Sequence, residues 1–407
     1  MKKVLLIAGV AFAAAGAMAD VTFSDMIVRQ LWPFKMTVAV DCIVSGVLTE
    51  TPIRVSVRDG ETALCDVPDI AIVKGGTVSS AGKHHLEFDP MLVPELRSRG
   101  IIRNFNVTLS ATAPEHVLYV VFDLTKNANE SGQLQYVTES ALRAGDWGTW
   151  ELNATSGSPI WTGVAADPQY AQTKLVFRYI PAGTFLMNNN RCVGQVTLSR
   201  DYFISVFYVT ASQYARLKGE TISPEDTKPK RWVSYNMLRG SAWPSEAAVA
   251  ADSDCAAFAA KLGTFTFDIP TSAQWEYAVR AGADGKDENN NDRLGFIGYT
   301  EDNLPDYVWY QGNTGWQMQP VGTRNPNPWG IYDPFGDVWH MCRDWAGPSS
   351  AGTDPVGPSS GETRLVRGGC VTSTNKGECN AIFAWGAVSP DETAKDIYGF
   401  RLVFHVR

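Results

Sequence analysis

The cysteines are the residues of this chain best suited to chemistry. There are seven of them, at Cys42, Cys65, Cys192, Cys255, Cys342, Cys370 and Cys379. Zinc knuckles and thioredoxin-type motifs need the spacing Cys-x-x-Cys, which the sequence lacks, so neither is predicted. Disulfides are the alternative if the protein is exported. Cys42 and Cys65 both lie in the N-terminal part and are candidates for one bridge.

A second group of chemically useful side chains lies in residues 327–345. This segment holds three tryptophans, two glycines, three aspartates and one of the five histidines, His340, without a helical or strand period. Large aromatic side chains anchor such a segment, while Gly and Asp form its turns. We therefore predict an ordered loop that fixes these groups in place.

Other known metal-binding and nucleotide-binding motifs are not matched, because the residues lack the required spacing. His84 and His85 are adjacent, so on a strand they point to opposite faces, and we interpret them as solvated residues rather than a metal pair. The acidic segment 284–292 lacks the ligand spacing of a calcium loop and is predicted to be a solvated insertion. P-loops and dinucleotide fingerprints do not occur in the sequence, so nucleotide-dependent activities have no support.

The first residues predict export. Lys2 and Lys3 precede an apolar run over 4–15, and Ala17-Met18-Ala19 forms a small-x-small site before Asp20. That run is too short to span a bilayer, so residues 1–19 are predicted to be a secretory signal peptide. We expect a periplasmic, cell-surface or extracellular protein without a membrane span.

The charge balance limits the partners. The chain carries 35 Lys+Arg against 43 Asp+Glu, a net charge of −8, and removal of Lys2 and Lys3 leaves 33 against 43, or −10. An acidic surface repels phosphate backbones and anionic lipids. Nucleic acid and membrane partners are therefore not expected, and a protein or a carbohydrate ligand stays open. A chain of 407 residues suggests two domains.

The first half is predicted to be all-β. Short runs of β-branched residues alternate with polar ones at 38–44, 53–57, 104–110, 117–122 and 134–137. Gly, Pro, Asn and Asp clusters separate these runs, so we predict an immunoglobulin-like sandwich over residues 20–125. The connecting segment 126–172 is rich in small polar residues but contains Trp147, Trp150 and Trp161. Three tryptophans predict a packed segment rather than a free linker.

The second half mixes strands and helices. A strand is predicted at 174–180, a hairpin-like return at 184–187 and another strand region at 196–207. Capping signals predict three helices, which begin at Thr210, at Asp252 or Ser253, and at Thr271, and which end at Gly219, Gly263 and Gly282. In the third helix Trp275 and Val279 are four residues apart, which predicts a buried apolar face.

Six segments stand in an order that resembles a known family. They are 180–185 (IPAGTF), 269–278 (IPTSAQWEYA), 320–322 (PVG), 327–345, 367–369 (RGG) and 399–402 (GFRL). They resemble the formylglycine-generating enzymes, or sulfatase-modifying factors, which typically read IPAGTF, LPTEAEWEYA, PVG, NxxGLYDMxGNVWEW, RGGSW and GFRL. The resemblance covers residues 173–407 and implies an irregular α+β domain related to the C-type lectin fold. The whole chain is therefore predicted to be α+β.

The resemblance implies a reaction that this chain is poorly equipped to perform. Family enzymes oxidise a sulfatase cysteine to formylglycine with O2 and a copper(I) ion held by two thiolates, which suit that soft ion. The two cysteines fall four and nine residues after the RGG segment, where this chain has Ser373 and Glu378. Cys370 and Cys379 are a shifted alternative pair, nine residues apart instead of five. Copper is therefore disfavoured, and a divergent oxidase is the alternative function.

The resemblance also suggests a disulfide and a calcium site. Cys342 and Cys379 stand where bacterial relatives place cysteines, so a disulfide between them is favoured in an exported chain. The calcium ligands of the family correspond to Asp333 and His340 and to carbonyl groups of Phe335 and Val338. Imidazole is a poor calcium ligand, so a loop held by backbone hydrogen bonds alone is favoured over an occupied calcium site.

The sequence therefore favours an exported binding or structural module without oxidase activity. Trp316, Trp329 and Trp385 are candidate ligand contacts, because aromatic side chains mark interaction centres. The alternative for each is a place in the domain core.

Overall fold

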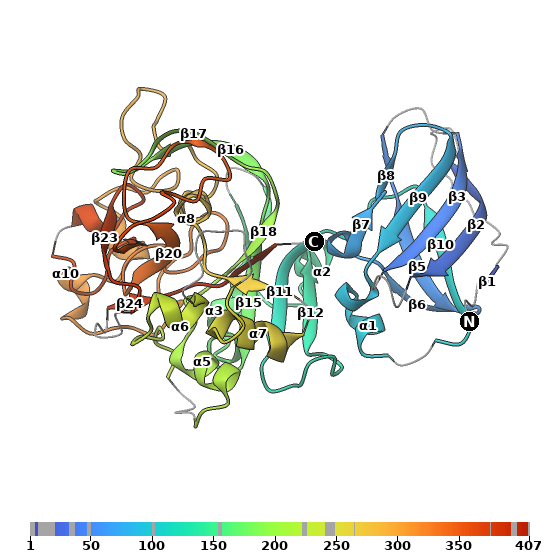
Figure 1. Ribbon diagram of the computed structural model, residues 1–407, viewed down its shortest axis with the longest axis horizontal. Helices are drawn as coiled ribbons and strands as arrows, with labels where there is room; N and C mark the ends of the chain where they lie inside the picture. Colours follow the sequence, from blue (N-terminus) through green and yellow to red (C-terminus); the bar gives the residue numbers. More distant parts are fainter. Residues whose placement is uncertain are drawn as a thin grey trace. The chain divides into compact units, whose positions relative to one another are not determined.

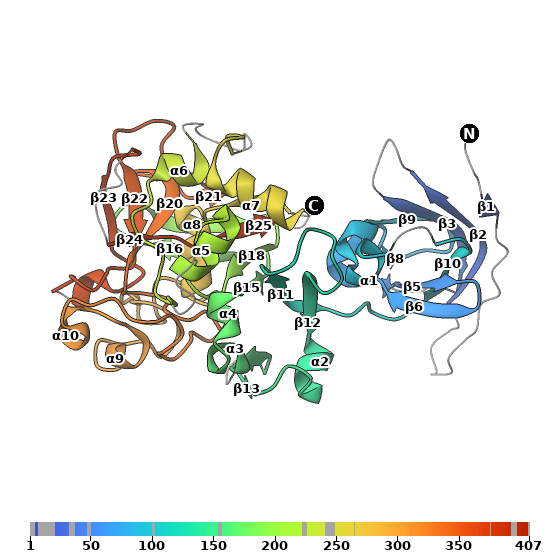
Figure 2. The ribbon, with the colours of Figure 1, turned by 90° about the horizontal axis from the view of Figure 1, so that it is seen from below.

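The computed structural model describes residues 5–6, 21–31, 37–46, 50–99, 102–153, 157–221, 226–240, 249–263, 265–374, 376–391 and 397–405. The chain folds into two compact units, visible in Figures 1 and 2. The first unit comprises residues 1–118 and 129–140, and the second comprises 119–128 and 141–406. In the described part of the chain no helix is long and apolar enough to cross a membrane.

The first unit is a β-sandwich, as predicted. One sheet has the order β1-β2-β3-β9-β7 and the other β10-β5-β6, and every neighbouring pair is antiparallel. Strands β2, β3, β9 and β7 follow the A-B-E-D order of an immunoglobulin sheet. The strands are β1 (Leu5–Leu6), β2 (Thr22–Gln30), β3 (Val38–Ser45), β5 (Arg54–Asp59), β6 (Thr62–Asp66), β7 (Ile72–Lys74), β9 (Gly82–Phe88) and β10 (Phe105–Ser110).

Short elements complete the first unit. Strands β4 (Thr51–Pro52) and β8 (Thr77–Val78) pair with each other. The turns η1 (Asp69–Ala71) and η2 (Pro90–Leu92), helix α1 (Pro94–Arg97) and strand β12 (Leu134–Thr138) follow, and α2 (Glu139–Ala144) begins as this unit ends. Val40, Val57 and Leu86 are fully buried, so the alternation of β-branched and polar residues does mark the core.

The second unit is built on an antiparallel sheet with an aromatic core. From Tyr119 onward β11 (Val117–Asp123) pairs with β15 (Lys174–Ile180), and the order continues with β18 (Tyr202–Ser205), β25 (Val403–His405) and β19 (Phe267–Asp268). Phe122 and Phe177 meet edge to face at 5.9 Å, and Phe203 stacks on Phe404 at 4.9 Å. Strands β13 (Trp150–Leu152) and β14 (Pro159–Trp161) pair beside it, with Trp161 fully buried.

The predicted hairpin return is wrong. Strand β16 (Gly183–Asn188) follows β15 but pairs with β17 (Val193–Leu198), and β21 (Gly352–Thr353) adds to β17 in parallel. The physical reason is that β11 and β18 already occupy both edges of β15. No hydrogen-bonding edge is left for β16.

The three predicted helices are confirmed, with both predicted caps for the first two and the N-cap for the third, which ends at Val279 with Arg280 as its C-cap. They are α5 (Ala211–Lys218), α7 (Asp254–Leu262) and α8 (Ser272–Val279). Thr210 and Thr271 form capping boxes and Ser253 caps α7, while Gly219 and Gly263 end their helices in the left-handed conformation. The remaining helical turns are α3 (Gly163–Ala166), α4 (Gln169–Gln172), α6 (Tyr235–Arg239), α9 (Leu304–Tyr307), α10 (Gln311–Thr314) and η3 (Lys376–Glu378).

A second sheet of this unit carries the motif residues. Its order is β23-β22-β20-β24, with bounds β20 (Trp339–Trp345), β22 (Arg364–Arg367), β23 (Ala384–Val388) and β24 (Tyr398–Gly399). His340 on β20 lies opposite Arg367 on β22. Residues 339–345, which were predicted to be part of a loop, therefore form a strand. The register of this strand brings the 327–345 segment and the RGG segment side by side.

Candidate functional site

Backbone hydrogen bonds join the 327–345 loop to the RGG segment. Gly336 N donates to Gly368 O at 2.8 Å, and Val371 N donates to Asp337 O at 3.0 Å. Gly368 has φ +86°, and a Cβ atom there would lie 3.0 Å from both the His340 ring and the Trp275 ring. Only glycine combines that backbone conformation with so close an approach. The two segments therefore form one packed region.

A buried carboxylate ties this region to α8. Glu276 accepts hydrogen bonds from Arg280 Nε at 2.9 Å and Arg367 Nη2 at 2.8 Å. It also accepts from Asn188 N at 2.9 Å and Asn189 Nδ2 at 2.7 Å. Burial alone would raise the pKa of Glu276, but the two guanidinium groups hold that pKa below its usual value. The carboxylate is fully partnered, which indicates a structural role.

The two alternative thiols lie close together but are buried. Ser373 Oγ accepts from Cys370 N at 3.1 Å and lies 3.9 Å from Cys370 Sγ. Cys379 Sγ would lie 2.8 Å from a Cβ at Gly369. Burial raises the pKa of both Cys370 and Cys379, so both are protonated at neutral pH. A thiol must lose its proton to bind a metal, so this environment disfavours a copper site.

The residues at the family's copper positions supply no substitute ligand set. Ser373 is buried and Glu378 is partly exposed. In the part of the chain that the structure describes, no three His, Cys, Asp or Glu residues converge in a way that could hold a metal. Neither Ser373 nor Glu378 offers the soft thiolate ligand that suits copper(I).

All seven cysteines are free thiols in the structure. Cys342 and Cys379 belong to one buried cluster with Trp275 and Phe335, whereas Cys42 lies on β3 and Cys65 on β6. Both proposed disulfides, Cys42–Cys65 and Cys342–Cys379, therefore remain predictions.

Two of the predicted calcium ligands contact the hydroxyl of a tyrosine. The Tyr208 hydroxyl lies 2.6 Å from Val338 O and 2.8 Å from Gly336 O, and it also contacts His340 Nε2. Asp333 is buried, and its Oδ2 accepts from Gly322 N at 2.8 Å. Phe335 contributes its ring to the buried cluster around Trp275. Two of the four predicted positions thus converge on a side-chain hydroxyl.

The three candidate tryptophans have different environments. Trp329 packs on Tyr277 at 5.2 Å and on the hydrophobic core. Trp385 is half-buried, 5.3 Å from Trp339. Trp316 is 55% exposed. Of the three, Trp316 is the one placed to contact a ligand.

Trp316 lines a cavity of about 380 Å³ in the second unit. A second exposed tryptophan, Trp232, which is 49% exposed, lines the same cavity. Both have left-handed backbone conformations, with φ +58° at Trp232 and +70° at Trp316. Two bulky aromatic residues therefore meet at one opening, each in a conformation that non-glycine residues rarely adopt.

The cavity is basic. Lys228, Lys230 and Arg231 line it, with Asp226 as the acidic member of the described lining and Thr372 of the RGG region at its wall. Lys230 Nζ lies 4.7 Å over the Tyr214 ring. The sequence reasoning missed this site, although the run Lys-Pro-Lys-Arg-Trp at 228–232 is a basic and aromatic signal in an acidic chain.

Two structural connections hold the cavity walls. Lys230 N donates to Val209 O at 2.8 Å, and Ala211 N donates to Lys228 O at 3.0 Å, which fixes the basic segment beside the start of α5. On the other wall, Gln319 N donates to Asp337 Oδ1 at 3.1 Å. Asp337 therefore positions the segment that follows Trp316.

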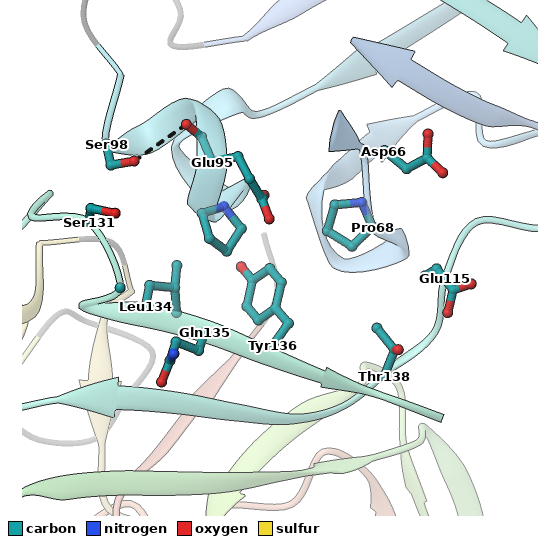
Figure 3. Close-up of a pocket in the computed structure, with 12 residues that line it drawn as sticks. Asp66, Pro68, Glu95, Ser98, Glu115, Ser131, Leu134, Gln135, Tyr136 and Thr138 are labelled. Atoms are coloured by element: carbon teal, nitrogen blue, oxygen red, sulfur yellow. Dashed lines mark hydrogen bonds between the residues drawn. The ribbon is translucent and has the colours of Figure 1, made fainter. Parts of the chain in front are cut away.

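The first unit has a cavity of opposite charge, shown in Figure 3, with a volume of about 400 Å³. Asp66, Glu95 and Glu115 line it around Tyr136, whose hydroxyl donates to Leu92 O at 2.7 Å. Two of these carboxylates have protein partners: Glu115 accepts from Ser140 Oγ at 2.6 Å, and Asp66 accepts from Ser56. An acidic cluster with its own partners is a weaker candidate than the basic cavity.

Comparisons with known proteins agree with the motif order. The formylglycine-generating enzyme of Streptomyces coelicolor is 32% identical over 143 residues, which cover 33% of this chain and 45% of that enzyme. The formylglycine-generating enzyme of Thermomonospora curvata is 30% identical over 146 residues, which cover 33% and 48%. The matched region thus spans about half the length of these curated relatives.

Among solved structures, Treponema denticola variable protein 1 matches with a TM-score of 0.47 and 21% identity, covering 57% of this chain and 96% of that chain. Residues 164–406, more than half of this chain, match the sulfatase-modifying factor enzyme 1-like domain. The chain therefore belongs to the sulfatase-modifying factor family, with its family domain in the C-terminal part.

Proposed function

We propose that this protein is an exported binding module, and that the basic cavity between Trp232 and Trp316 holds an acidic segment of a partner protein. The observation that carries the proposal is the combination of three cations and two exposed tryptophans in one cavity. The chain as a whole has a net charge of −8. A local basic site on an acidic protein concentrates an anionic ligand at that site and repels it elsewhere.

The backbone of the tryptophans supports the same proposal. A non-glycine residue in the left-handed region costs about 1–3 kcal/mol and persists where the surrounding structure enforces it, often at ligand clamps. Neither Trp232 nor Trp316 offsets that cost by full burial. Two residues with this backbone strain at one cavity fit a ligand clamp, in which the strain holds the tryptophan side chains in position for the ligand.

The side-chain types favour a protein ligand over a carbohydrate. Tryptophan and arginine are enriched among residues that dominate binding energy at protein interfaces. Arg231 and Trp232 are neighbours in sequence and both are exposed. An acidic oligosaccharide is the competing ligand, and binding experiments separate the two.

A glutamate-rich peptide is the first probe, compared with a lysine-rich peptide and a polyuronate oligosaccharide by isothermal titration calorimetry. We expect the glutamate-rich peptide to bind and binding to weaken with added salt, because the attraction is partly electrostatic. Trp316→Ala weakens binding by roughly tenfold or more, as removal of an anchoring aromatic side chain does. Arg231→Glu weakens it further by charge reversal.

Matched substitutions outside the cavity provide the control. Ile297 is 56% exposed, so Ile297→Ala removes an exposed apolar group, and Lys286→Glu makes the same charge change as Arg231→Glu. Both leave the affinity unchanged if the cavity is the binding site. Binding of the polyuronate alone would reject a protein partner, and equal losses in the control variants would reject the cavity.

A divergent oxidase is the second candidate function. Its support is the contact of 3.1 Å between Cys370 Sγ and Thr372 Oγ1, because Thr372 lines the basic cavity. The test is incubation with copper, O2 and a cysteine-containing sulfatase peptide, followed by mass spectrometry. Loss of the substrate thiol in the wild type but not in Cys370→Ser would replace the binding proposal with this one.

A further inference from the structure

The predicted calcium position is filled by a protein atom. A calcium ion needs six to eight oxygen ligands at about 2.3–2.6 Å. Here the carbonyls of Gly336 and Val338 and the His340 ring all face the Tyr208 hydroxyl, at 2.8 Å and 2.6 Å for the carbonyls. The phenol oxygen therefore stands between Val338 and His340, two of the four predicted ligand positions, where an ion bound by both would have to lie. The residues present do not fit calcium.

The hydrogen bonds at this hydroxyl are mutually consistent. A phenol has one proton, and Val338 O is the closer of the two carbonyl acceptors. The imidazole must then donate from Nε2 to the phenol oxygen, so Nδ1 carries no proton. His340 Nδ1 indeed has no hydrogen-bond partner among the described residues. The Tyr208 and His340 rings also pack together, with centroids 4.3 Å apart.

A buried arginine holds the neighbouring carbonyls. Arg401 Nη2 donates to Asp333 O at 2.7 Å and also to Tyr332 O, and its guanidinium lies 4.7 Å over the Tyr208 ring. Its Nη1 donates to Ser205 O at 2.9 Å and Val206 O at 2.8 Å. Arg401 thus supplies a fixed positive charge and connects the loop to β18.

We propose that Tyr208 and Arg401 together replace a loop cation, so that the loop holds its conformation without a divalent metal. A bound ion gathers several backbone carbonyls around one centre. In this chain Tyr208 gathers those of residues 336 and 338, and Arg401 gathers those of residues 332 and 333. The replacement is independent of the ligand proposed for the basic cavity.

Two atoms of the loop argue for a cation. Asp333 Oδ1 and Asp337 Oδ2 are both buried and have no hydrogen-bond partner among the described residues. Two carboxylate oxygens still fall short of the six to eight oxygen ligands that calcium requires. Measurement of bound calcium in the wild-type protein decides between an occupied calcium site and the replacement by Tyr208 and Arg401.

The first experiment uses the wild-type protein purified without chelator. We expect no bound calcium by elemental analysis, and the same melting temperature in EDTA and in millimolar calcium. A stoichiometric calcium content, or a melting temperature that rises with calcium concentration as linkage requires for a ligand of the folded state, would overturn the proposal.

The second experiment removes the hydroxyl with Tyr208→Phe. We expect amide hydrogen exchange at residues 336–339 to accelerate roughly tenfold, because the Val338 carbonyl and the His340 ring lose their hydrogen-bond partner. Tyr202→Phe is the matched control: that hydroxyl donates to Gln274 O at 2.6 Å, outside the loop. The control should leave loop exchange unchanged. Equal exchange in wild type and Tyr208→Phe would contradict the proposal.

The third experiment removes the Tyr208 hydroxyl and restores a carboxylate at position 340, so that a calcium ion can bind. Tyr208→Ala with His340→Glu opens the centre and adds a carboxylate, so the double variant should gain a calcium-dependent melting temperature. Tyr208→Ala alone, which keeps the imidazole, is the control and should gain little. If calcium stabilises the single and double variants equally, the centre is not the cation position and the proposal fails.

Discussion

At the scale of single residues, Asp344 makes the stability of the fold depend on pH. It lies in the second unit, is buried, and its Oδ2 accepts from Ser272 N at 2.7 Å. Burial raises the pKa of Asp344 to about 6, against the opposing effects of that hydrogen bond and of Arg343. A carboxyl with a higher pKa in the folded protein binds its proton more tightly there, so it stabilises the fold at low pH.

Asp344→Asn tests this expectation, because the amide does not titrate. The contribution of Asp344 is complete below the unfolded pKa of about 4 and is lost as the pH rises through about 6. Relative to the variant, the wild type should therefore lose about 2 kcal/mol of unfolding free energy between pH 4 and pH 7. Urea unfolding at each pH measures the difference.

Asp292→Asn is a control in which the pH dependence of stability should have the opposite sign. Hydrogen bonds from Asn188 and Lys286 hold the pKa of Asp292 below its usual value, so its contribution is lost as the pH falls. A pH-independent difference between wild type and Asp344→Asn would show that the carboxyl is not titrating in this range.

Sequence reasoning succeeds for residues whose partners are local. Thr210 and Thr271 cap helices through residues three positions away, so the pattern is visible in the sequence. Tyr208 could not be found in this way, because its partners lie 128 to 132 residues along the chain. Its role depends on tertiary structure that no local pattern encodes.

At the scale of elements, one carboxylate on α8 holds three parts of the second unit together. Glu276 bonds Arg280 in its own helix, Arg367 on β22, and Asn188 and Asn189 at the end of β16 and just after it. Its side chain is inaccessible to solvent. The motif residues Glu276 and Arg367 therefore position elements of the second unit, a role that needs no bound metal.

Glu276→Gln should leave two buried guanidinium groups without a counter-charge. Breaking a buried ion pair by removing one partner costs about 3–5 kcal/mol, so we expect a loss of that order in the free energy of unfolding, measured by urea titration. Lys286→Gln is the matched control: it removes one partner of an exposed pair with Asp292, and surface pairs contribute about 0–1 kcal/mol. Similar losses in both variants would contradict the structural role.

The pairing of strands β15 and β16 could not be predicted from the sequence. The residue ranges of β15 and β16 were predicted well, but their pairing was not, because β11 comes from more than fifty residues earlier and occupies one edge of β15. Strand patterns identify which residues are buried, whereas pairing depends on competition between distant strands. The basic cavity was missed for a related reason, since Trp232 and Trp316 meet only after folding.

At the scale of the whole molecule, the distribution of cysteines gives a further prediction. Six of the seven are buried in the structure, and Cys65 is partly exposed. A disulfide between Cys342 and Cys379, or between Cys42 and Cys65, would lower the number of free thiols by two. We expect peptide mapping of the protein, purified under oxidising conditions, to recover Cys342 linked to Cys379. Recovery of Cys342 or Cys379 as an alkylated thiol after denaturation would reject that bridge.

The buried thiols also have a consequence for measuring motion. An alkylating reagent reacts with a thiolate that it can reach, so it modifies a buried cysteine only when the surrounding structure opens. Cys42 lies in the first unit and Cys255 in the second. The rate at which each cysteine is modified under native conditions therefore reports how often its own unit opens, without an added label. A ligand that binds the basic cavity should slow the modification of Cys255 and leave that of Cys42 unchanged.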